Sequence, residues 1–244
     1  MFGFGRAAVA GVDIGSSAVK AVALKRSGTD RWRLVACASE PVPHGAIVDG
    51  GIVEPDAVAA SVRRVLSRSG FRGADVVTSL AGSAVIAKQV TLPMMTDDEL
   101  AGAIEWEAGH YIPFDIQDVT LDYLPLKTTT DATGRASRDV LLVAAKRQRV
   151  AEYADVVARA GRRVVVVDLD AFALQNAYEA NYGQSPSVVV LINAGASAIN
   201  VNIVSGERSL FTRDVSVGGD AYTDAIARAL NVPFELAERA KRGV

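Results

Sequence analysis

The sequence predicts a mixed α/β protein in which two copies of one fold flank a smaller inserted α+β unit. Two of the supporting observations concern the ends: residues 1–82 read as strand, strand, strand, helix, strand, and residues 169–244 again read as strands followed by helices. The third is that residues 83–168 follow an order of their own: strand, helix, strand, strand, helix, strand. A chain of 244 residues, half of them apolar, is long enough to bury the cores of two medium domains.

Each strand and helix expected in the first segment has its own signal in the sequence. Apolar alternation predicts strands over residues 9–24 and 31–38 and a short strand over residues 46–48. Pro55 suits the first turn of a helix, and Gly70 can serve as its C-terminal cap. A buried strand, ADVVTSLAG, closes the segment. The face of the helix that we expect to be buried carries Val58, Val62, Val65, Leu66 and Ser69.

The middle segment begins with AVIAKQVTL, which alternates as a strand. Thr96 and Glu99 have the T-x-x-E spacing of a capping box, so we expect a helix over residues 97–110, ended by Pro113. Two strands, VTLDYLPL and RDVLLVAAK, flank a polar loop over residues 127–138. A second helix and the buried strand RRVVVVDLD complete this unit.

Composition excludes several classes of function. A formal net charge of −2 gives no electrostatic footprint for nucleic acid, and one cysteine excludes an internal disulfide. The two histidines, His44 and His110, lie far apart in sequence, which argues against a zinc site or a Ser-His-Asp triad. The stretch MFGFGRAAVAG lacks the charged start and continuous apolar segment expected of a signal peptide, and no uninterrupted apolar run reaches about 18 residues. We therefore expect a cytoplasmic protein without direct membrane insertion.

A short stretch near the start recurs later in the chain. GVDIGSSAVKAVAL, residues 11–24, aligns without gaps on residues 191–204, at a constant offset of 180 residues. Each copy has a polar residue at the end of a strand, a glycine two positions on, and a hydroxyl two beyond that. The pairs are Asp13 with Asn193, Gly15 with Gly195, Ser17 with Ser197, and Lys20 with Asn200.

This pattern suits a phosphate. Glycine lets a phosphate approach the backbone closely, and turn amides with the Ser16 and Ser17 hydroxyls can hold anionic oxygens. Lys20 adds a positive charge, and Asp13 can hold a hydrated magnesium ion. The spacing alone is equally compatible with two hairpins that bind no ligand. A pair of facing turns that clamp a nucleotide is the alternative.

Longer motifs carry a family resemblance. DIGSSAVK, NAGASAIN, VSVGGDAYTDAIARAL and AERAK are similar to the successive nucleotide-site motifs of the actin/Hsp70/hexokinase superfamily. Within it, GAIVDGGIVEPDAVAASVRRVL, TLPMMTDDELAGAIEWEAGHYIPFDIQDVTLDYLPL and VDLDAFALQNAY resemble the PilM family of type IV pilus assembly proteins, relatives of the cell-division protein FtsA. The resemblance covers essentially the whole chain. It implies an actin-like (ribonuclease H-like) fold of two lobes with an inserted α+β subdomain of the SHS2 type.

The resemblance also implies ATP or ADP with Mg²⁺ between the lobes. The first phosphate loop falls on Asp13, Gly15, Ser16, Ser17 and Lys20, with Asp13 contacting Mg²⁺ through water, and the second falls on Asn193, Gly195 and Ser197. Asp170 takes the position at which relatives orient the attacking water. Gly218 and Gly219 match the glycine pair before the second lobe's helix, and Glu238 and Lys241 match the pair that flanks the nucleoside.

Two departures from the family bear on activity. Relatives usually carry an aspartate where this chain has Asn193, and an amide is neither a negative metal partner nor a proton acceptor, so hydrolysis should be weak or absent. The sequence stops at Val244, soon after AERAK begins. We therefore expect a C-terminally truncated second lobe and a nucleotide site that lacks one wall.

In this family the inserted subdomain and the first lobe form a groove for the N-terminal cytoplasmic peptide of PilN. PilN is an inner-membrane protein, and through it the chain would meet PilO and lie at the inner face of the cytoplasmic membrane. Trp106 lies about 120° from the stripe formed by Leu100, Ile104 and Ala108, so it either marks a contact surface or packs under a neighbouring strand. Tyr111 and Phe114 either line the groove or fix their loop to the core. Self-association is a further possibility.

The expected function is therefore a nucleotide-binding scaffold of type IV pilus assembly with little or no ATPase activity. An FtsA-like division protein is one alternative. Another is a small-molecule kinase of the same superfamily, which would need a carboxylate to take the proton of a substrate hydroxyl. A third is a chain that binds only the peptide and no nucleotide.

Overall fold

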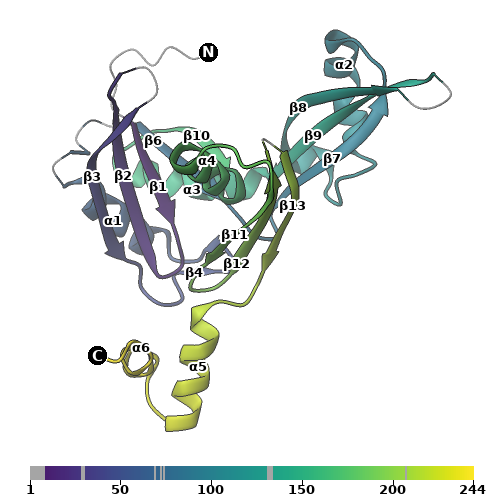
Figure 1. Cartoon of the computed structure of the whole chain (residues 1–244). Coiled ribbons are helices and arrows are strands. Elements are labelled where there is room, and N and C mark those ends of the chain that lie inside the picture. The colour runs from purple at the N-terminus through teal and green to yellow at the C-terminus, as the bar shows by residue number, and fades with distance from the viewer. Residues whose placement is uncertain are drawn as a thin grey trace. The chain divides into compact units, whose positions relative to one another are not determined.

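The computed structural model describes residues 9–28, 31–68, 70–71, 73, 75–130, 134–206 and 208–244. It divides into two compact units (Figure 1). The larger comprises Met1–Gly82 and Glu152–Val244, and the smaller comprises Ser83–Ala151. Within the described ranges, every helix is too short or too polar to cross a membrane.

The larger unit contains a five-stranded sheet in the order β10-β6-β1-β2-β3. The first three strands along the chain form an antiparallel meander, and β6 and β10 extend it in parallel. Val12 and Ile14 of β1 are buried, as are Val58 and Val62 of the helix α1, which packs on β2 and β3. The elements are β1 (Val9–Ile14), β2 (Ala18–Arg26), β3 (Trp32–Pro41), β4 (Ile47–Val48), β5 (Gly51–Ile52), α1 (Pro55–Leu66), β6 (Asp75–Leu80) and β10 (Val164–Leu169).

The helix predicted to begin near Pro55 is present as α1, and its residues Val65 and Leu66 are buried, as predicted. Ser69, which we placed on the same face, lies outside the described residues.

A second sheet in the same unit repeats the opening meander, in the order β11-β12-β13. Asp13 lies opposite Lys20 in the first meander, and Asn193 lies opposite Asn200 in the second. This is the register that the offset of 180 residues predicts. The elements are α4 (Asp170–Tyr182), β11 (Val188–Ala194), β12 (Ile199–Ser205), β13 (Arg208–Val215), α5 (Gly219–Leu230) and α6 (Phe234–Arg242).

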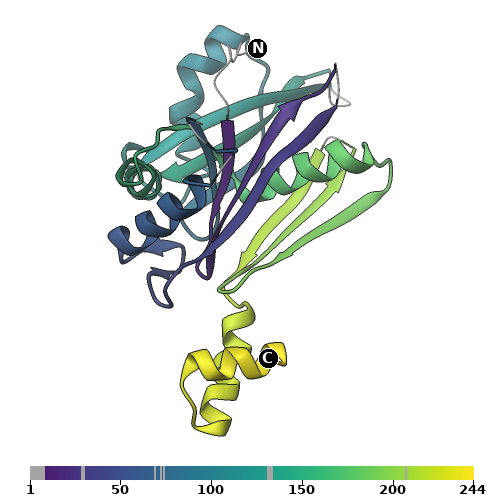
Figure 2. The ribbon, with the colours of Figure 1, turned by 90° about the vertical axis from the view of Figure 1, so that its left-hand side faces the viewer.

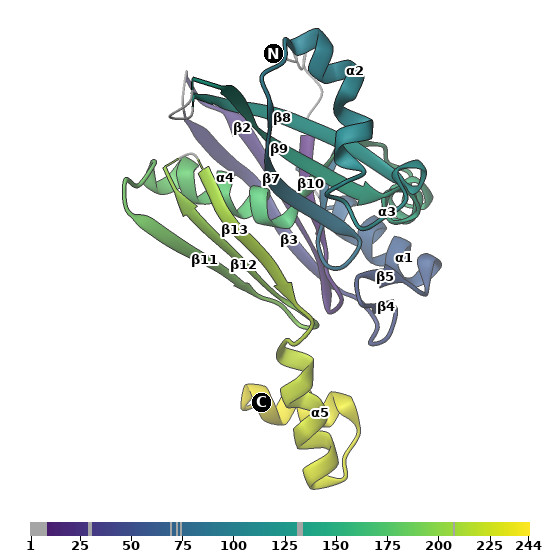
Figure 3. The same ribbon diagram turned by 90° about the vertical axis from the view of Figure 1, so that its right-hand side faces the viewer.

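The smaller unit is a three-stranded antiparallel sheet, in the order β7-β9-β8, with the helix α2 packed against it (Figure 3). The predicted capping box is present, because the Thr96 hydroxyl accepts from the Glu99 amide and the Glu99 carboxylate accepts from the Thr96 amide. Leu100, Ile104 and Ala108 of α2 are buried, as predicted. The elements are β7 (Val85–Pro93), α2 (Asp97–Ala108), the 3-10 turn η1 (Ile116–Asp118), β8 (Val119–Thr130) and β9 (Ala136–Lys146).

The structure differs from the expected end of the inserted unit. The compact unit ends at Ala151 rather than at residue 168. The reason is that β10 pairs with β6, and that α3 (Arg147–Arg159) is tied to the larger unit through the Tyr153 hydroxyl, which donates to the Gly50 carbonyl at 3.2 Å. The strands β8 and β9 also extend into the predicted polar loop, where Thr129 lies opposite Ser137.

Candidate nucleotide site and partner face

The first phosphate turn joins β1 to β2. The Gly15 amide donates to the Ala18 carbonyl at 3.1 Å and closes the turn. Asp13 and Lys20 are cross-strand neighbours at its base, and the Lys20 Nζ lies 2.9 Å from the Asp13 Oδ2. Both side chains are more than half exposed. A carboxylate and an ammonium group therefore stand together beside the turn, where a ligand can reach both.

The second turn has the same backbone and a different chemistry. The Gly195 amide donates to the Ala198 carbonyl at 2.9 Å. A Cβ added to Gly195 would lie 2.9 Å from that carbonyl oxygen, so the turn requires glycine. The positions of the ion pair are occupied by two amides, and the Asn193 Nδ2 donates to the Asn200 Oδ1 at 3.0 Å. The second turn therefore carries no charge where the first carries two.

The two turns approach each other. The Ser16 hydroxyl donates to the Ser197 hydroxyl at 3.0 Å, across 181 positions of sequence. The amides of Ser16, Ser17, Ala196 and Ser197 donate no backbone hydrogen bond to another described residue. Successive amides of this kind form a concavity that binds anions. The structure thus brings together the two predicted loops and leaves their amides available.

Two residues that the sequence reasoning missed, Asp214 and Ser79, connect the second turn and Asp170 to the rest of the unit. The Asn200 Nδ2 donates to the Asp214 Oδ1 at 2.7 Å, and the Gly82 amide donates to the Asp214 Oδ2. The Ser79 hydroxyl donates to the Asp170 Oδ1 at 2.5 Å. Asn200 was identified from the sequence as the counterpart of Lys20 in the repeat. Asp214 and Ser79 carry no motif, because only strand pairing places them here.

Asp170 begins α4 and lies among other acids. Burial raises the pKa of Asp170; the hydrogen bond from Ser79 opposes the rise, and the negative charges of Asp13, Asp214 and Asp168 add to it. Burial also raises the pKa of Asp168. Within the described ranges, no three or more histidine, cysteine or acidic side chains are grouped so that they could hold a metal ion by themselves. The acids nonetheless make this end of the site favourable for a cation.

The glycine pair fixes α5 to the second turn. A Cβ added to Gly218 would lie 2.3 Å from the Ala196 carbonyl oxygen, which leaves no room for a side chain. The Gly219 amide donates to the Gly195 carbonyl at 3.0 Å. The start of α5 is therefore hydrogen-bonded to the turn that is expected to hold phosphate.

Glu238 and Lys241 lie beside this glycine pair. The Lys241 Nζ donates to the Gly219 carbonyl at 3.1 Å and lies 2.5 Å from the Glu238 Oε2. Partial burial would raise the pKa of Glu238, but hydrogen bonds from Lys241, Thr223 and Arg242, with the charge of Lys241, lower it to about 2. The predicted nucleoside pair is thus an ion pair within α6, and both of its members are hydrogen-bonded to α5, through Thr223 and Gly219.

The three predicted partner residues fall in two environments within the smaller unit. Trp106 is 70% exposed, and its ring meets only the edge of His110 among the ring contacts of the described residues, at 4.6 Å between centroids. Tyr111 and Phe114 are partly buried and pack against the core of the unit. Trp106 is therefore exposed to solvent, whereas the other two residues pack their loop against the core.

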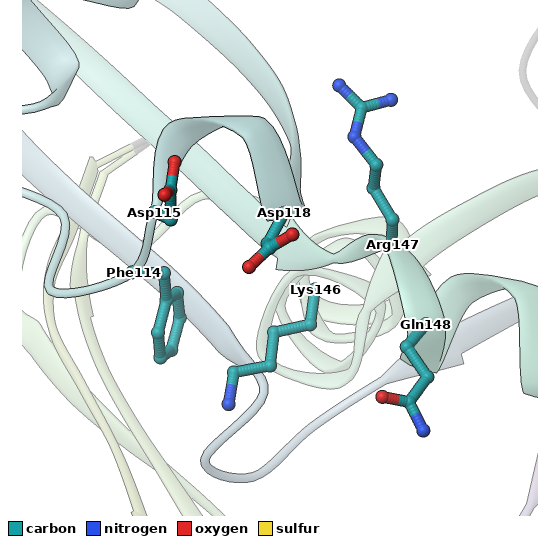
Figure 4. Close-up of a pocket in the computed structure, with 6 residues that line it drawn as sticks. All are labelled: Phe114, Asp115, Asp118, Lys146, Arg147 and Gln148. Atoms are coloured by element: carbon teal, nitrogen blue, oxygen red, sulfur yellow. The ribbon is translucent and has the colours of Figure 1, made fainter.

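A pocket of about 390 Å³ lies next to Phe114 (Figure 4). The Lys146 ammonium lies 4.8 Å from the centroid of the Phe114 ring. The Asp115 carboxylate accepts from the Gln117 amide at 2.9 Å, and the Arg147 Nε donates to the Gln117 carbonyl at 3.1 Å. The pocket thus mixes charges of both signs; its lining residues are Phe114, Asp115, Asp118, Lys146, Arg147 and Gln148.

Comparison with known proteins decides the family. The model of the family of type IV pilus assembly protein PilM matches residues 11–244. The chain belongs to the PilM family. A solved structure described as the PilM-PilN type IV pilus biogenesis complex matches with a TM-score of 0.84 and 33% sequence identity, covering 98% of this chain and 70% of that chain.

More distant structures share the fold. The cytoplasmic domain of EpsL from the type II secretion system of Vibrio cholerae matches with a TM-score of 0.55 at 16% identity, covering 86% of this chain and 71% of that one. MreB 5 of Spiroplasma citri, solved bound to AMPPNP, matches with a TM-score of 0.52 at 15% identity, covering 97% of this chain and 62% of that one. The predicted actin-like fold and the predicted family are confirmed. The PilM match does not favour the division-protein or kinase alternatives.

Proposed function

We propose that this chain is a nucleotide-binding scaffold of type IV pilus assembly that docks the N-terminal cytoplasmic tail of PilN. The observation that carries the proposal is the apposition of the two glycine turns through Ser16 and Ser197, in a chain of the PilM family. Two facing turns with free amides can bind the oxygens of a triphosphate chain, whereas two hairpins that bind no ligand do not require this arrangement.

The residues present fit ATP or ADP with Mg²⁺. The four free turn amides and Lys20 would hold phosphate oxygens, and the missing Cβ atoms of Gly15 and Gly195 leave the backbone open to them. Asp13 would hold the hydrated ion, since Mg²⁺ is usually bound by one or two carboxylates, waters and phosphates. When bound, Mg²⁺ would neutralise phosphate charge. Glu238 and Lys241 would flank the nucleoside next to Gly219.

Turnover would be slow. Asp170 would orient the attacking water and accept its proton, and burial raises the pKa of its carboxyl group. The Asn193–Asn200 amide pair offers the second turn no carboxylate of its own. The hydrogen bonds that Asn200 and Gly82 donate to Asp214 fix its carboxylate, so that it is not free to turn toward a metal ion. The nucleotide would therefore act by binding more than by hydrolysis.

The PilN peptide would bind the smaller unit through Trp106. Trp106 is an exposed aromatic residue on a rigid helix, and its buried neighbours Leu100 and Ile104 fix that helix to the sheet. The matched structure of a PilM-PilN complex supports PilN as the occupant. Docking of a membrane protein's tail would place this chain at the inner face of the cytoplasmic membrane, with PilO reached through PilN.

Calorimetry with ATP and Mg²⁺ tests the nucleotide part. Lys20→Ala should weaken binding about tenfold, as expected for the loss of one charged hydrogen bond to phosphate. Lys88→Ala, an exposed lysine of the smaller unit, is the matched control and should bind as the wild type does. Equal affinities in the two variants would remove Lys20 from the site, and absence of binding by the wild type would overturn the nucleotide assignment.

A synthetic peptide of the PilN N-terminus tests the partner part. Trp106→Ala should weaken binding about tenfold or more, because exposed aromatic anchors dominate such interfaces. Trp32→Ala removes the other tryptophan, which lies in the larger unit, and should leave the peptide affinity unchanged. Undiminished binding by Trp106→Ala would contradict the assignment of this face.

A further inference from the structure

The Ser79 hydroxyl, near the end of β6, is hydrogen-bonded to the acid that would take a proton during hydrolysis. The Ser79 Oγ donates to the Asp170 Oδ1 at 2.5 Å, although 91 positions of sequence separate the two residues. A hydroxyl within hydrogen-bond reach of a base is the arrangement in which the base takes the proton while the oxygen attacks. Asp170 therefore has a protein hydroxyl beside it, which can take the place of the attacking water.

Ser79 belongs to a row of polar residues across β10, β6 and β1, which lie side by side in the sheet (Figure 1). Asp168 of β10 lies opposite Ser79, and Val12 of β1 lies opposite Thr78. Asp13 and Ser79 are the next residues of two parallel strands, whose backbones lie about 4.8 Å apart. Val12 and Thr78 are buried, so Asp13 and Ser79 both project from the other face of the sheet.

This row lies at the edge of the sheet from which the first phosphate turn starts. The carboxyl ends of the parallel strands β1 and β6 meet at one edge, and ligands of open α/β sheets bind at such an edge. Gly15 follows Asp13 there, and the turn meets the second turn through Ser16 and Ser197 (Figure 2). The Ser79 hydroxyl therefore lies beside the place proposed for the phosphates of the nucleotide.

Neighbouring hydroxyls have partners of another kind. The Thr78 hydroxyl is buried and donates to the Val12 carbonyl at 2.9 Å. The Ser16 hydroxyl donates to the Ser197 hydroxyl at 3.0 Å. Neither acceptor is a base that could take the proton of an attacking hydroxyl. Ser79 differs from both, because it donates to a carboxylate and is only partly buried.

We infer that Ser79 is a phosphoryl acceptor, to which the chain transfers the γ-phosphoryl group of its own bound ATP. The inference rests on the proposed nucleotide site. The Ser79 Oγ forms a bond to the γ-phosphorus while the bond from that phosphorus to the bridging oxygen breaks. ADP leaves with the bridging oxygen, and the hydroxyl proton passes to Asp170, as a substrate hydroxyl proton passes to an aspartate in protein kinases. The reaction ends after one phosphoryl group per chain.

Incubation of the chain with ATP and Mg²⁺, followed by fragment mass spectrometry, tests the assignment. Phosphoserine should form at residue 79, at a rate independent of protein concentration, because donor and acceptor belong to one molecule. Ser79→Ala should abolish it and Ser79→Thr should retain it. Asp170→Asn should slow it about a hundredfold or more, because the amide still accepts the hydrogen bond but is no base. Ser83→Ala removes the next serine of the chain and should react as the wild type does.

Calorimetry with ATP on the same samples separates this inference from the proposed site. Ser79→Ala and Asp170→Asn should both still bind ATP, so that a lost nucleotide does not explain the lost modification. ATP binding by the wild type without phosphate on Ser79, or with phosphate on Ser16 or Ser197 instead, would overturn the inference and leave the nucleotide site in place. A wild-type rate in Asp170→Asn, or a rate that rises with protein concentration, would also overturn it. Absence of ATP binding would overturn both.

Discussion

Glu238→Gln tests the ion pair within α6 and the hydrogen bond that Thr223 of α5 donates to the Glu238 carboxylate. In the folded chain Glu238 accepts from Thr223 at 2.5 Å and from Arg242 at 2.7 Å, and lies 2.5 Å from the Lys241 ammonium. Burial alone would raise the pKa of Glu238, but these contacts lower it from 4.5 to about 2. The full difference corresponds to about 3 kcal/mol. Since the carboxylate is partly exposed, solvent screening reduces the expected contribution to about 1–2 kcal/mol.

The sign of the pH dependence follows from the lowered pKa. A carboxyl group with a lower pKa in the folded state stabilises that state fully above the unfolded pKa of 4.5, and the stabilisation is lost as the pH falls toward about 2. Hydrogen exchange of the α6 amides measures it locally. At neutral pH, Glu238→Gln should speed this exchange about five- to thirtyfold.

The control is Glu235→Gln, which neutralises an exposed acid on the same helix. Its α6 amides should exchange at nearly the wild-type rate. The difference in amide protection between the wild type and Glu238→Gln should become smaller as the pH falls from 4.5 toward about 2. Equal protection in the two variants at neutral pH, or a gap that persists in acid, would refute the reasoning.

Four further substitutions test the site and the smaller unit. Gly195→Ala should weaken nucleotide binding and lower the free energy of unfolding, because the added Cβ would meet a backbone oxygen at 2.9 Å. Gly102→Ala, on the exposed face of α2 with nothing within 4 Å of the added Cβ, should instead raise the free energy of unfolding by about 0.5–1 kcal/mol. Urea unfolding measures the free energy of unfolding of both variants. Ser79→Ala should raise the pKa of Asp170 further, since the hydrogen bond from Ser79 lowers it; a carboxyl NMR titration that shows no rise would contradict this. Thr96→Ala should cost about 1 kcal/mol through loss of the capping box, and unchanged urea unfolding would argue against that cap.

The repeated turn was predictable because its signal is local. A glycine two positions after the end of a strand fixes the turn, and the alternation on either side fixes the register, so one offset of 180 residues places Asp13 opposite Lys20 and Asn193 opposite Asn200. The capping box of α2 was predictable for the same reason. Roles for these residues in binding a nucleotide remain predictions.

Other features depend on pairing between distant segments. The apolar run of β10 reads as a strand whichever sheet it joins, so its sequence could not show that it pairs with β6 and lies outside the inserted unit. Asp214 and Ser79 reach the site because β13 and β6 lie beside the turns, and an isolated aspartate or serine in a strand carries no such information. The exposure of Trp106 was open for a similar reason, because helical periodicity alone does not show which second face is covered.

The two ends of the smaller unit leave it side by side. Val85, where β7 begins, pairs with Ala145 near the end of β9, and the Lys146 amide donates to the Ala84 carbonyl at 2.9 Å. The unit therefore stands on two adjoining strands, between β6 and the helix that leads back to its parallel neighbour β10. Such an attachment is modular: the surface proposed to bind the partner could be lengthened, redesigned or exchanged for another domain without changing the register of the sheet that carries the first of the two predicted phosphate turns.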